Sequence, residues 1–421
     1  MYLMNEQVRS IAEQCSKPEA RVNELSLLEL RPYVESFLDS NWLNNKLKEY
    51  EIWASENSDP VLQRNRLHRP FGFNMLVASI WAARSWENIY KEEPSFEPPS
   101  GAKRLISIAC SLAVLELHAG QLLDQTTRRY LQQRLQNTQG LWSIIHELHT
   151  FAYFIRKGAE VRPHFLNKAS PQEITVQWHG VDIPVQCKAK LPGSGRLIRQ
   201  DVFTLLAGYI SRDTRVSGRK LVVRIGSTGA IQYEDVEFLR KQISTGIGSG
   251  IGPALVTNKE RTFTVQSQPL TGQFTVKAIR DYLSTFNFHV GMVIGEPAQN
   301  GNGYDVAAVV GIEADPKEKP WESLKRSIER AAKQLKDGPA GIIAIHYADP
   351  IEDFETLRPD ASSLRITLGE LLNPRPHVGA VLLSSEPDLQ LPRAGDPGQV
   401  RIYHRQPWPF PDDFLSNALF N

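Results

Sequence analysis

Glu173, Gln186 and Lys188 are polar residues whose spacing could bring them onto one surface. Apolar and polar residues alternate through residues 173–178 and again through 181–190, which predicts two half-buried strands. Residues two apart on a strand face the same way, so Gln186 and Lys188 share the polar face of the second strand. A carboxylate, an amide oxygen and an ammonium on one surface could bind a metal ion or a phosphate. These three residues are therefore the first candidates for an active site.

The two strands need a turn between them and an apolar face behind them. His179-Gly180 supplies the turn, so the pair is predicted to form a β-hairpin. Cys187 lies between Gln186 and Lys188 and so faces the core side of its strand. We interpret it as a small packed thiol rather than a nucleophile. Pro184 fits this strand poorly, because proline cannot donate to the sheet ladder.

A carboxylate upstream of the hairpin is predicted to point inward. Ile144, Leu148 and Phe151 recur at helical spacing, and Glu147 lies at the edge of this apolar stripe. Acidic residues are rarely buried unless they are paired or coordinated. Glu147 is therefore a fourth candidate. His146 and His149 are only three residues apart, whereas the zinc motif HExxH needs histidines four apart, so we interpret them as ordinary helix histidines.

The order of elements around the hairpin resembles that of a nuclease superfamily. A helix containing Glu147 is followed by a strand near 160–165, the hairpin, a helix at 200–209 and a strand at 220–225. This order and these residues resemble the PD-(D/E)xK nucleases, which include many restriction and repair endonucleases. The resemblance implies an α/β fold (an α+β mixed sheet) with a restriction-endonuclease-like core, preceded here by a helical N-terminal region.

The resemblance also implies roles for the candidate residues. In this family an acidic residue opens the second strand and a (D/E)xK tripeptide lies on the third; Glu173 and Gln186-Cys187-Lys188 fall at these positions. Mg²⁺ (or Mn²⁺) would be held by Glu173, Gln186 and the backbone carbonyl of Cys187. Lys188 would orient the attacking water or stabilise the phosphorane, and Glu147 would be the helix carboxylate that many members carry.

The tripeptide departs from the family pattern, because Gln186 replaces an acidic residue and removes one charge from the metal site. The remaining charges have a simpler interpretation as well. Glu173 and Lys188 could form a cross-strand ion pair, which would contribute about 0.2–1 kcal/mol without any catalytic role. The sequence leaves both interpretations open.

The charge distribution is compatible with a nucleic-acid ligand near the hairpin and, equally, with solvated charged faces. Residues 137–226 contain thirteen Lys and Arg against six Asp and Glu, a balance of +7, although the net charge of the whole chain is +1. A basic segment beside the site is what phosphate binding requires. Within it, Arg196 and Arg199 are predicted to contact phosphate, with DNA as the expected substrate. Arg128, Arg129 and Arg134 lie upstream on one predicted helix, which we interpret as a solvated face.

Length and periodicity predict three regions: a helical domain at 1–136, a nuclease-like domain at 137–350, and a C-terminal α/β extension at 351–421. The helical domain could bind a protein partner. The helix at 321–336 and the strand at 342–345 are predicted to pack onto the same sheet as the hairpin.

Composition predicts a cytoplasmic protein that does not associate with a membrane. The three cysteines are far apart with no CxxC pair, which argues against zinc and disulfides. The N-terminus lacks the features of a secretory signal, and the apolar run at 105–115 is too short to span a bilayer.

Three functions are consistent with these observations. The first is a metal-dependent endonuclease, possessing the site described above and acting in restriction or defence. The second is a degenerate nuclease fold that binds nucleic acid or a protein partner without cleavage. The third is a protein-interaction scaffold whose sheet is unrelated to nucleases.

Overall fold

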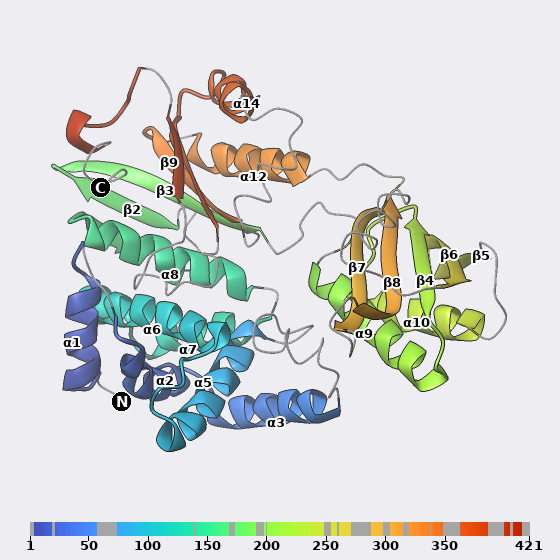
Figure 1. The fold of residues 1–421 in the computed structure, drawn as a ribbon. Helices are drawn as coiled ribbons and strands as arrows, with labels where there is room; N and C mark the ends of the chain where they lie inside the picture. Colours follow the sequence, from blue (N-terminus) through green and yellow to red (C-terminus); the bar gives the residue numbers. More distant parts are fainter. Residues whose placement is uncertain are drawn as a thin grey trace. The chain divides into compact units, whose positions relative to one another are not determined.

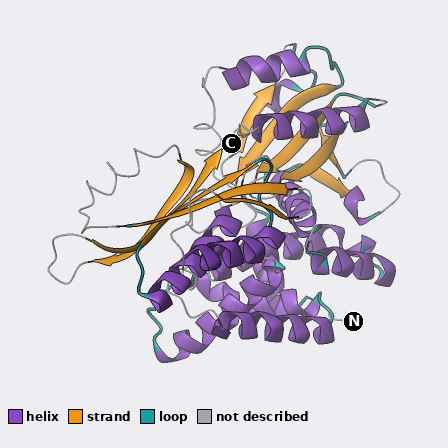
Figure 2. Cartoon of the chain, turned by 90° about the vertical axis from the view of Figure 1, so that its right-hand side faces the viewer, coloured by secondary structure: helices purple, strands orange, loops and turns teal. Residues whose placement is uncertain are grey.

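The computed structural model of the chain describes residues 4–18, 22–56, 74–138, 140–167, 173–190, 198, 200–247, 254–258, 261–270, 288–297, 304–314, 320–336, 338–347, 363–385, 400–404 and 407–414. The chain divides into two compact units, one comprising Met1–Ser55, Leu67–Pro192 and Trp321–Asn421 and the other Glu56–Arg66 and Gly193–Pro320 (Figure 1). Helices and mixed sheets are both extensive in the described residues (Figure 2), which confirms the α/β class.

The N-terminal part of the first unit is helical, as the sequence predicts. Its helices are α1 (Glu6–Cys15), α2 (Leu27–Ser36), α3 (Ser40–Glu56), α5 (Met75–Glu92), α6 (Ser100–Ala119), α7 (Gln125–Gln136) and α8 (Leu141–Arg156). Short polar residues begin several of them: the side chains of Asn5, Asn74 and Asp124 accept hydrogen bonds from backbone N–H groups in the first turns of α1, α5 and α7. Three-residue 3-10 turns occur at Glu24–Ser26, Gly120–Leu122 and His164–Leu166.

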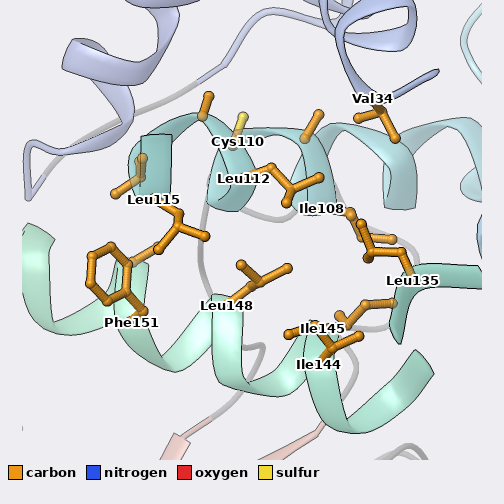
Figure 3. Packing of buried hydrophobic residues seen from close by; sticks show 14 of the residues in the cluster. Val34, Ile108, Cys110, Leu112, Leu115, Leu135, Ile144, Ile145, Leu148 and Phe151 are labelled. Carbon is orange, nitrogen blue, oxygen red and sulfur yellow. The ribbon is translucent and has the colours of Figure 1, made fainter. Parts of the chain in front are cut away.

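Helix α8 lies between α6 and the sheet of the first unit (Figure 1). Leu112 and Leu115 of α6 pack with Leu148 and Phe151 of α8, and all four are fully buried (Figure 3). Burial of each such side chain contributes about 1.5–3 kcal/mol. The segment Gly101–Leu122 is long and apolar enough to cross a membrane, but 67% of its apolar 18-residue window is buried inside the structure, as in the core helix of a globular domain.

The first unit contains a six-stranded mixed sheet. Its strands, in spatial order, are β1 (Glu160–Pro163), β2 (Ile174–Trp178), β3 (Val181–Lys190), β9 (Gly341–Tyr347), β10 (Val378–Ser385) and β11 (Val400–His404). The pairs β3/β9 and β9/β10 are parallel, and the other neighbours are antiparallel. The predicted hairpin is confirmed as β2–β3. His179 and Gly180 both have positive φ (48° and 79°), which matches the right-handed twist of the two strands.

The sheet is covered on both faces. Val185 and Cys187 of β3 and Ala344 of β9 belong to the same core as α8. Ile343 and Ile345 of β9 instead pack with buried residues of two helices on the opposite face, α12 (Pro320–Leu335) and α14 (Ser363–Leu372). The prediction that α12 and β9 join the sheet of the hairpin is therefore confirmed.

Strand β3 accommodates Pro184 through the way it pairs with β9. The β3/β9 ladder begins at Val185 and Ile342, so Pro184 lies just before it. Beside Pro184 lies Gly341, where a Cβ would come within 2.6 Å of the Pro184 carbonyl oxygen. The two backbones approach so closely here that only glycine fits without a shift of one strand.

The second unit contains a five-stranded mixed sheet of its own. In spatial order its strands are β5 (Ala254–Asn258), β6 (Arg261–Pro269), β4 (Leu221–Ser227), β8 (Tyr304–Ala314) and β7 (Phe288–Pro297). Only β4 and β8 pair in parallel. Helices α9 (Gln200–Ser217) and α10 (Tyr233–Ile247) pack against this sheet and each other.

This second sheet corrects one expectation from the sequence. The strand predicted at 220–225 exists as β4, but both of its edges are paired within the second sheet, so it cannot pair with the hairpin. The strand beside β3 is β9, reached through α12. The compact units consequently differ from the predicted regions 1–136, 137–350 and 351–421: residues 193–320 separate, and β10 and β11 complete the sheet of the hairpin.

Candidate active site

Three of the four candidate residues are in direct contact. Glu173 precedes β2, opposite the part of β3 that carries Gln186 and Lys188. The Lys188 Nζ donates to Glu173 Oε1 at 2.9 Å and to Gln186 Oε1 at 3.4 Å. The backbone oxygen of Glu173 accepts hydrogen bonds from the N–H groups of His164 and Phe165, which anchors this residue to the turn after β1.

Glu147 is buried, as predicted, and its direct partner is an arginine. Its carboxylate accepts hydrogen bonds from Arg134 Nη1 (2.6 Å), Arg134 Nη2 (2.9 Å) and the hydroxyl of Ser143 (3.0 Å). The interpretation of Arg134 as part of a solvated face is therefore wrong. Two signals in the sequence could have identified it. An inward carboxylate needs a cation, and Arg134 lies beside Leu135, a core residue of the same helix.

The four charged groups of the site act on one another. Burial raises the pKa of Glu173 above its ordinary value; the ammonium of Lys188 opposes this shift, and the negative charge of Glu147 adds to it. Burial lowers the pKa of Arg134, but its hydrogen bonds to Glu147 and the charges of Glu147 and Glu173 outweigh burial and raise it. The negative charge of Glu147 thus reaches Glu173 and disfavours the ionised form of the Glu173 carboxyl.

One oxygen in this site is left over. Glu173 Oε2 is buried and has no hydrogen-bond partner in the part of the chain that the structure describes. A buried carboxylate oxygen without a donor is costly unless a cation or a water reaches it. Glu173 Oε2 and the amide oxygen of Gln186 are hard oxygen donors of the kind Mg²⁺ binds. Both oxygens of Glu147, by contrast, are already engaged by Arg134.

The donor set is therefore sparse but fits Mg²⁺, which keeps several waters and needs few protein ligands. Within the described ranges, no cluster of three or more His, Cys, Asp and Glu residues could hold a metal ion, so a site here would rely on Gln186 and on backbone oxygen. Burial raises the pKa of the Cys187 thiol well above its ordinary value. The thiol is thus held protonated, in agreement with a packing role for its side chain.

Arg196 and Arg199, the predicted phosphate contacts, lie outside the described residues. Of the helix arginines, Arg128 is paired with Glu116, which is largely buried.

Three histidines lie next to the site, of which His146 and His346 are buried and His149 is partly buried. His146 Nε2 is 3.0 Å from the backbone oxygen of Ala344, and His149 Nε2 is 3.2 Å from Ser107 Oγ. His346 of β9, which the sequence analysis does not single out, stacks on the His146 ring with centroids 5.5 Å apart. Burial lowers the pKa of all three to about 3. All three rings are therefore neutral at neutral pH.

No protein-family model, curated protein or solved structure matches this chain. The geometry of the site joins a partly buried carboxylate with a raised pKa, an amide oxygen and an ammonium, with a second carboxylate beside them. Such a set can bind a cation and an anion together, as a phosphodiester hydrolase requires.

Proposed function

We propose that this protein is a metal-dependent nuclease with a PD-(D/E)xK-like site. The observation that carries the proposal is the cluster of Glu173, Gln186 and Lys188 around one buried carboxylate oxygen that has no donor in the described chain. A cross-strand ion pair alone needs neither Gln186 nor an unsatisfied oxygen. A metal site uses both.

The order of elements in the first unit supports the proposal. Helix α8, strands β1, β2 and β3, helix α12 and strand β9 follow one another, with β9 parallel to β3. This is the helix–strand order that the sequence resemblance implies, provided that residues 193–320 are an insertion between β3 and α12. The insertion folds as a separate compact unit, which explains how the core tolerates it.

In the proposed site each residue has one task. Glu173 and Gln186, with the Cys187 carbonyl, would hold Mg²⁺, which would neutralise phosphate charge and lower the pKa of a bound water. Lys188, already anchored by Glu173, orients the nucleophilic water or stabilises the developing negative charge. Glu147 holds Arg134 and adds negative charge to the metal site. DNA is the proposed substrate.

The experiment that tests the proposal compares the wild type with Lys188→Met on single- and double-stranded DNA and RNA, in Mg²⁺ and in Mn²⁺. Loss of the positioned ammonium should reduce cleavage by about 100-fold or more. The matched control is Lys46→Met. Lys46 Nζ also donates to a carboxylate, Glu49 Oε2 at 2.7 Å, but this pair lies on the exposed surface of α3. Equal cleavage by the wild type and Lys188→Met, or no cleavage at all, would exclude this site as a nuclease centre.

A second candidate function is nucleic-acid binding without cleavage. The observation that favours it is the engagement of both Glu147 oxygens by Arg134, which leaves Glu173 as the available carboxylate of the site. Salt-dependent binding of DNA by a protein that cleaves none of these substrates would support this function instead.

A further inference from the structure

The guanidinium of Arg134 has one unused side. Its Nη1 and Nη2 donate one hydrogen each to Glu147, and Nη1 also donates to the backbone oxygen of Phe165 at 3.3 Å. An arginine has five N–H donors in a fixed planar arrangement. The two that remain, on Nε and Nη2, lie side by side and have no partner among the described residues. This Nε/Nη2 fork is one of the two pairs through which arginine binds phosphate or carboxylate with two hydrogen bonds.

The surrounding contacts hold this fork in a defined orientation. Glu147 is nearly inaccessible and is itself held by Ser143, so the Arg134 guanidinium is gripped from one side. The ring of Tyr130 lies 5.8 Å from its central carbon. The Arg134 side chain nonetheless retains 20% of its accessible surface. A held guanidinium that solvent still reaches loses little conformational freedom when it binds a ligand.

The charges of the site indicate an anionic ligand. Glu147 and Glu173 contribute two negative charges, and Arg134 and Lys188 contribute two positive charges, one for each carboxylate. Without Arg134 the site would carry a net negative charge and would repel a phosphodiester. With Arg134 the net charge is zero before any metal binds, and a bound cation would make it positive.

We infer that Arg134 binds a phosphate of a nucleic-acid substrate through its Nε/Nη2 fork, while Glu147 acts as the residue that positions it. The choice of nucleic acid as the ligand rests on the proposed function. Arg134 thereby offers phosphate two parallel hydrogen bonds. Lys188 is engaged with Glu173 and Gln186 and offers phosphate only a single ammonium.

Arg128 provides a matched comparison on the same helix. It too pairs with a largely buried carboxylate, that of Glu116, but its Nε donates to the backbone oxygen of Leu123 at 3.1 Å. Its Nε/Nη2 fork is thus used inside the protein. Its guanidinium also lies over the ring of Phe37, at 5.6 Å. Arg128 should therefore not bind substrate as Arg134 does.

The test measures binding of fluorescein-labelled single- and double-stranded oligonucleotides of DNA and RNA by fluorescence anisotropy, with EDTA present so that cleavage does not interfere. Arg134→Lys keeps the charge but loses the fork, and should weaken binding by about tenfold. Arg128→Lys should leave affinity unchanged. The double variant Arg134→Gln, Glu147→Gln avoids an unpaired buried charge, and it should weaken binding and reduce the slope of log affinity against log salt by about one.

Unchanged affinity in both Arg134 variants, or an equal loss in Arg128→Lys, would overturn the inference, as would a wild type that binds none of the oligonucleotides. The cleavage assay is separate. Binding that weakens in the Arg134 variants of a protein that cleaves nothing supports the inference and overturns the nuclease proposal. Cleavage by the wild type together with unchanged binding in the variants supports the nuclease proposal and overturns the inference about Arg134.

Discussion

Each of the two sheets contains an ion pair between neighbouring strands, and the two pairs differ in their surroundings. In the first unit Lys188 Nζ lies 2.9 Å from Glu173 Oε1, with side chains 24% and 18% exposed. In the second unit Arg224 Nε of β4 lies 2.6 Å from Glu313 Oε1 of β8, with side chains 30% and 32% exposed. By distance and exposure alone the two pairs are similar.

Their neighbours make the difference. Beside Lys188 and Glu173 lie a fully buried amide, Gln186, and a second, buried carboxylate, and one Glu173 oxygen has no partner in the described chain. The position paired with Arg224 on β6 is Gln266, which is only partly buried. An ion pair therefore indicates a binding or catalytic site when neighbouring groups leave a charge or a carboxylate oxygen without a partner. A short distance between the two charges is not enough.

The largest expected difference between the units concerns pH. The folded first unit keeps His146, His149 and His346 neutral, with pKa values of about 3 against an ordinary 6.5. The unfolded chain therefore binds more protons between these values, so the free energy of unfolding falls as pH decreases below 6.5. At pH 5 each neutral ring should lower the free energy of unfolding by about 2 kcal/mol. The three together should lower it by about 6 kcal/mol, which is comparable to the total stability of a typical protein. The cations Lys188, Arg156 and Arg104 add to the shifts.

Tryptophan fluorescence can measure this effect for one unit, because all eight tryptophans lie in the first. The midpoint of urea unfolding, followed by fluorescence, should move to lower urea concentration when the pH is lowered from 7 to 5. Circular dichroism reports both units. It should retain a transition of the second unit that depends less on pH, because residues 193–320 contain a single histidine. A fluorescence midpoint that does not change with pH would contradict the burial of neutral histidines.

The next largest effect concerns the buried pair of the first unit. Glu147→Ala leaves the Arg134 charge without its partner and should lower the free energy of unfolding by about 3–5 kcal/mol. Glu313→Ala, in the partly exposed Arg224–Glu313 pair of the second unit, should cost about 0–1 kcal/mol. Fluorescence-detected urea unfolding reports the first variant and circular dichroism the second. Similar losses in both variants would show that burial does not distinguish the Arg134–Glu147 pair from the Arg224–Glu313 pair. Glu147→Gln should lose less than Glu147→Ala, because it keeps the shape of the side chain and one accepting oxygen.

The smallest effect concerns the missing carboxylate of the tripeptide. Gln186→Glu adds a charge beside Glu173, whose pKa is already raised, so the metal-free variant should be less stable than the wild type. A carboxylate is a stronger ligand for Mg²⁺ than an amide, so the Mg²⁺ concentration needed for thermal stabilisation should fall by about tenfold. The control is Gln266→Glu, which adds a carboxylate opposite Arg224. An equal response to Mg²⁺ in the wild type and both variants would argue against a metal site at Gln186.

The local parts of the site follow from sequence patterns. Alternation and the turn residues predicted β2 and β3, and the two-residue period placed Gln186 and Lys188 opposite Cys187. The helical period predicted that Glu147 points inward. These features depend on interactions within a few residues, which the order of residue types expresses directly.

Only the tertiary structure shows which strands pair and which helices pack together. Strand β4 has the same buried, aliphatic character as β9, and nothing in its residues shows that it pairs with β6 and β8 rather than with β3. The partner of Glu147 is likewise a matter of long-range packing: Arg128 and Arg134 lie on one helix, yet Arg134 pairs with Glu147 of α8 and Arg128 with Glu116 of α6. Strand pairing and the pairing of buried charges depend on which surfaces are buried together, and residues far apart in the sequence determine that burial.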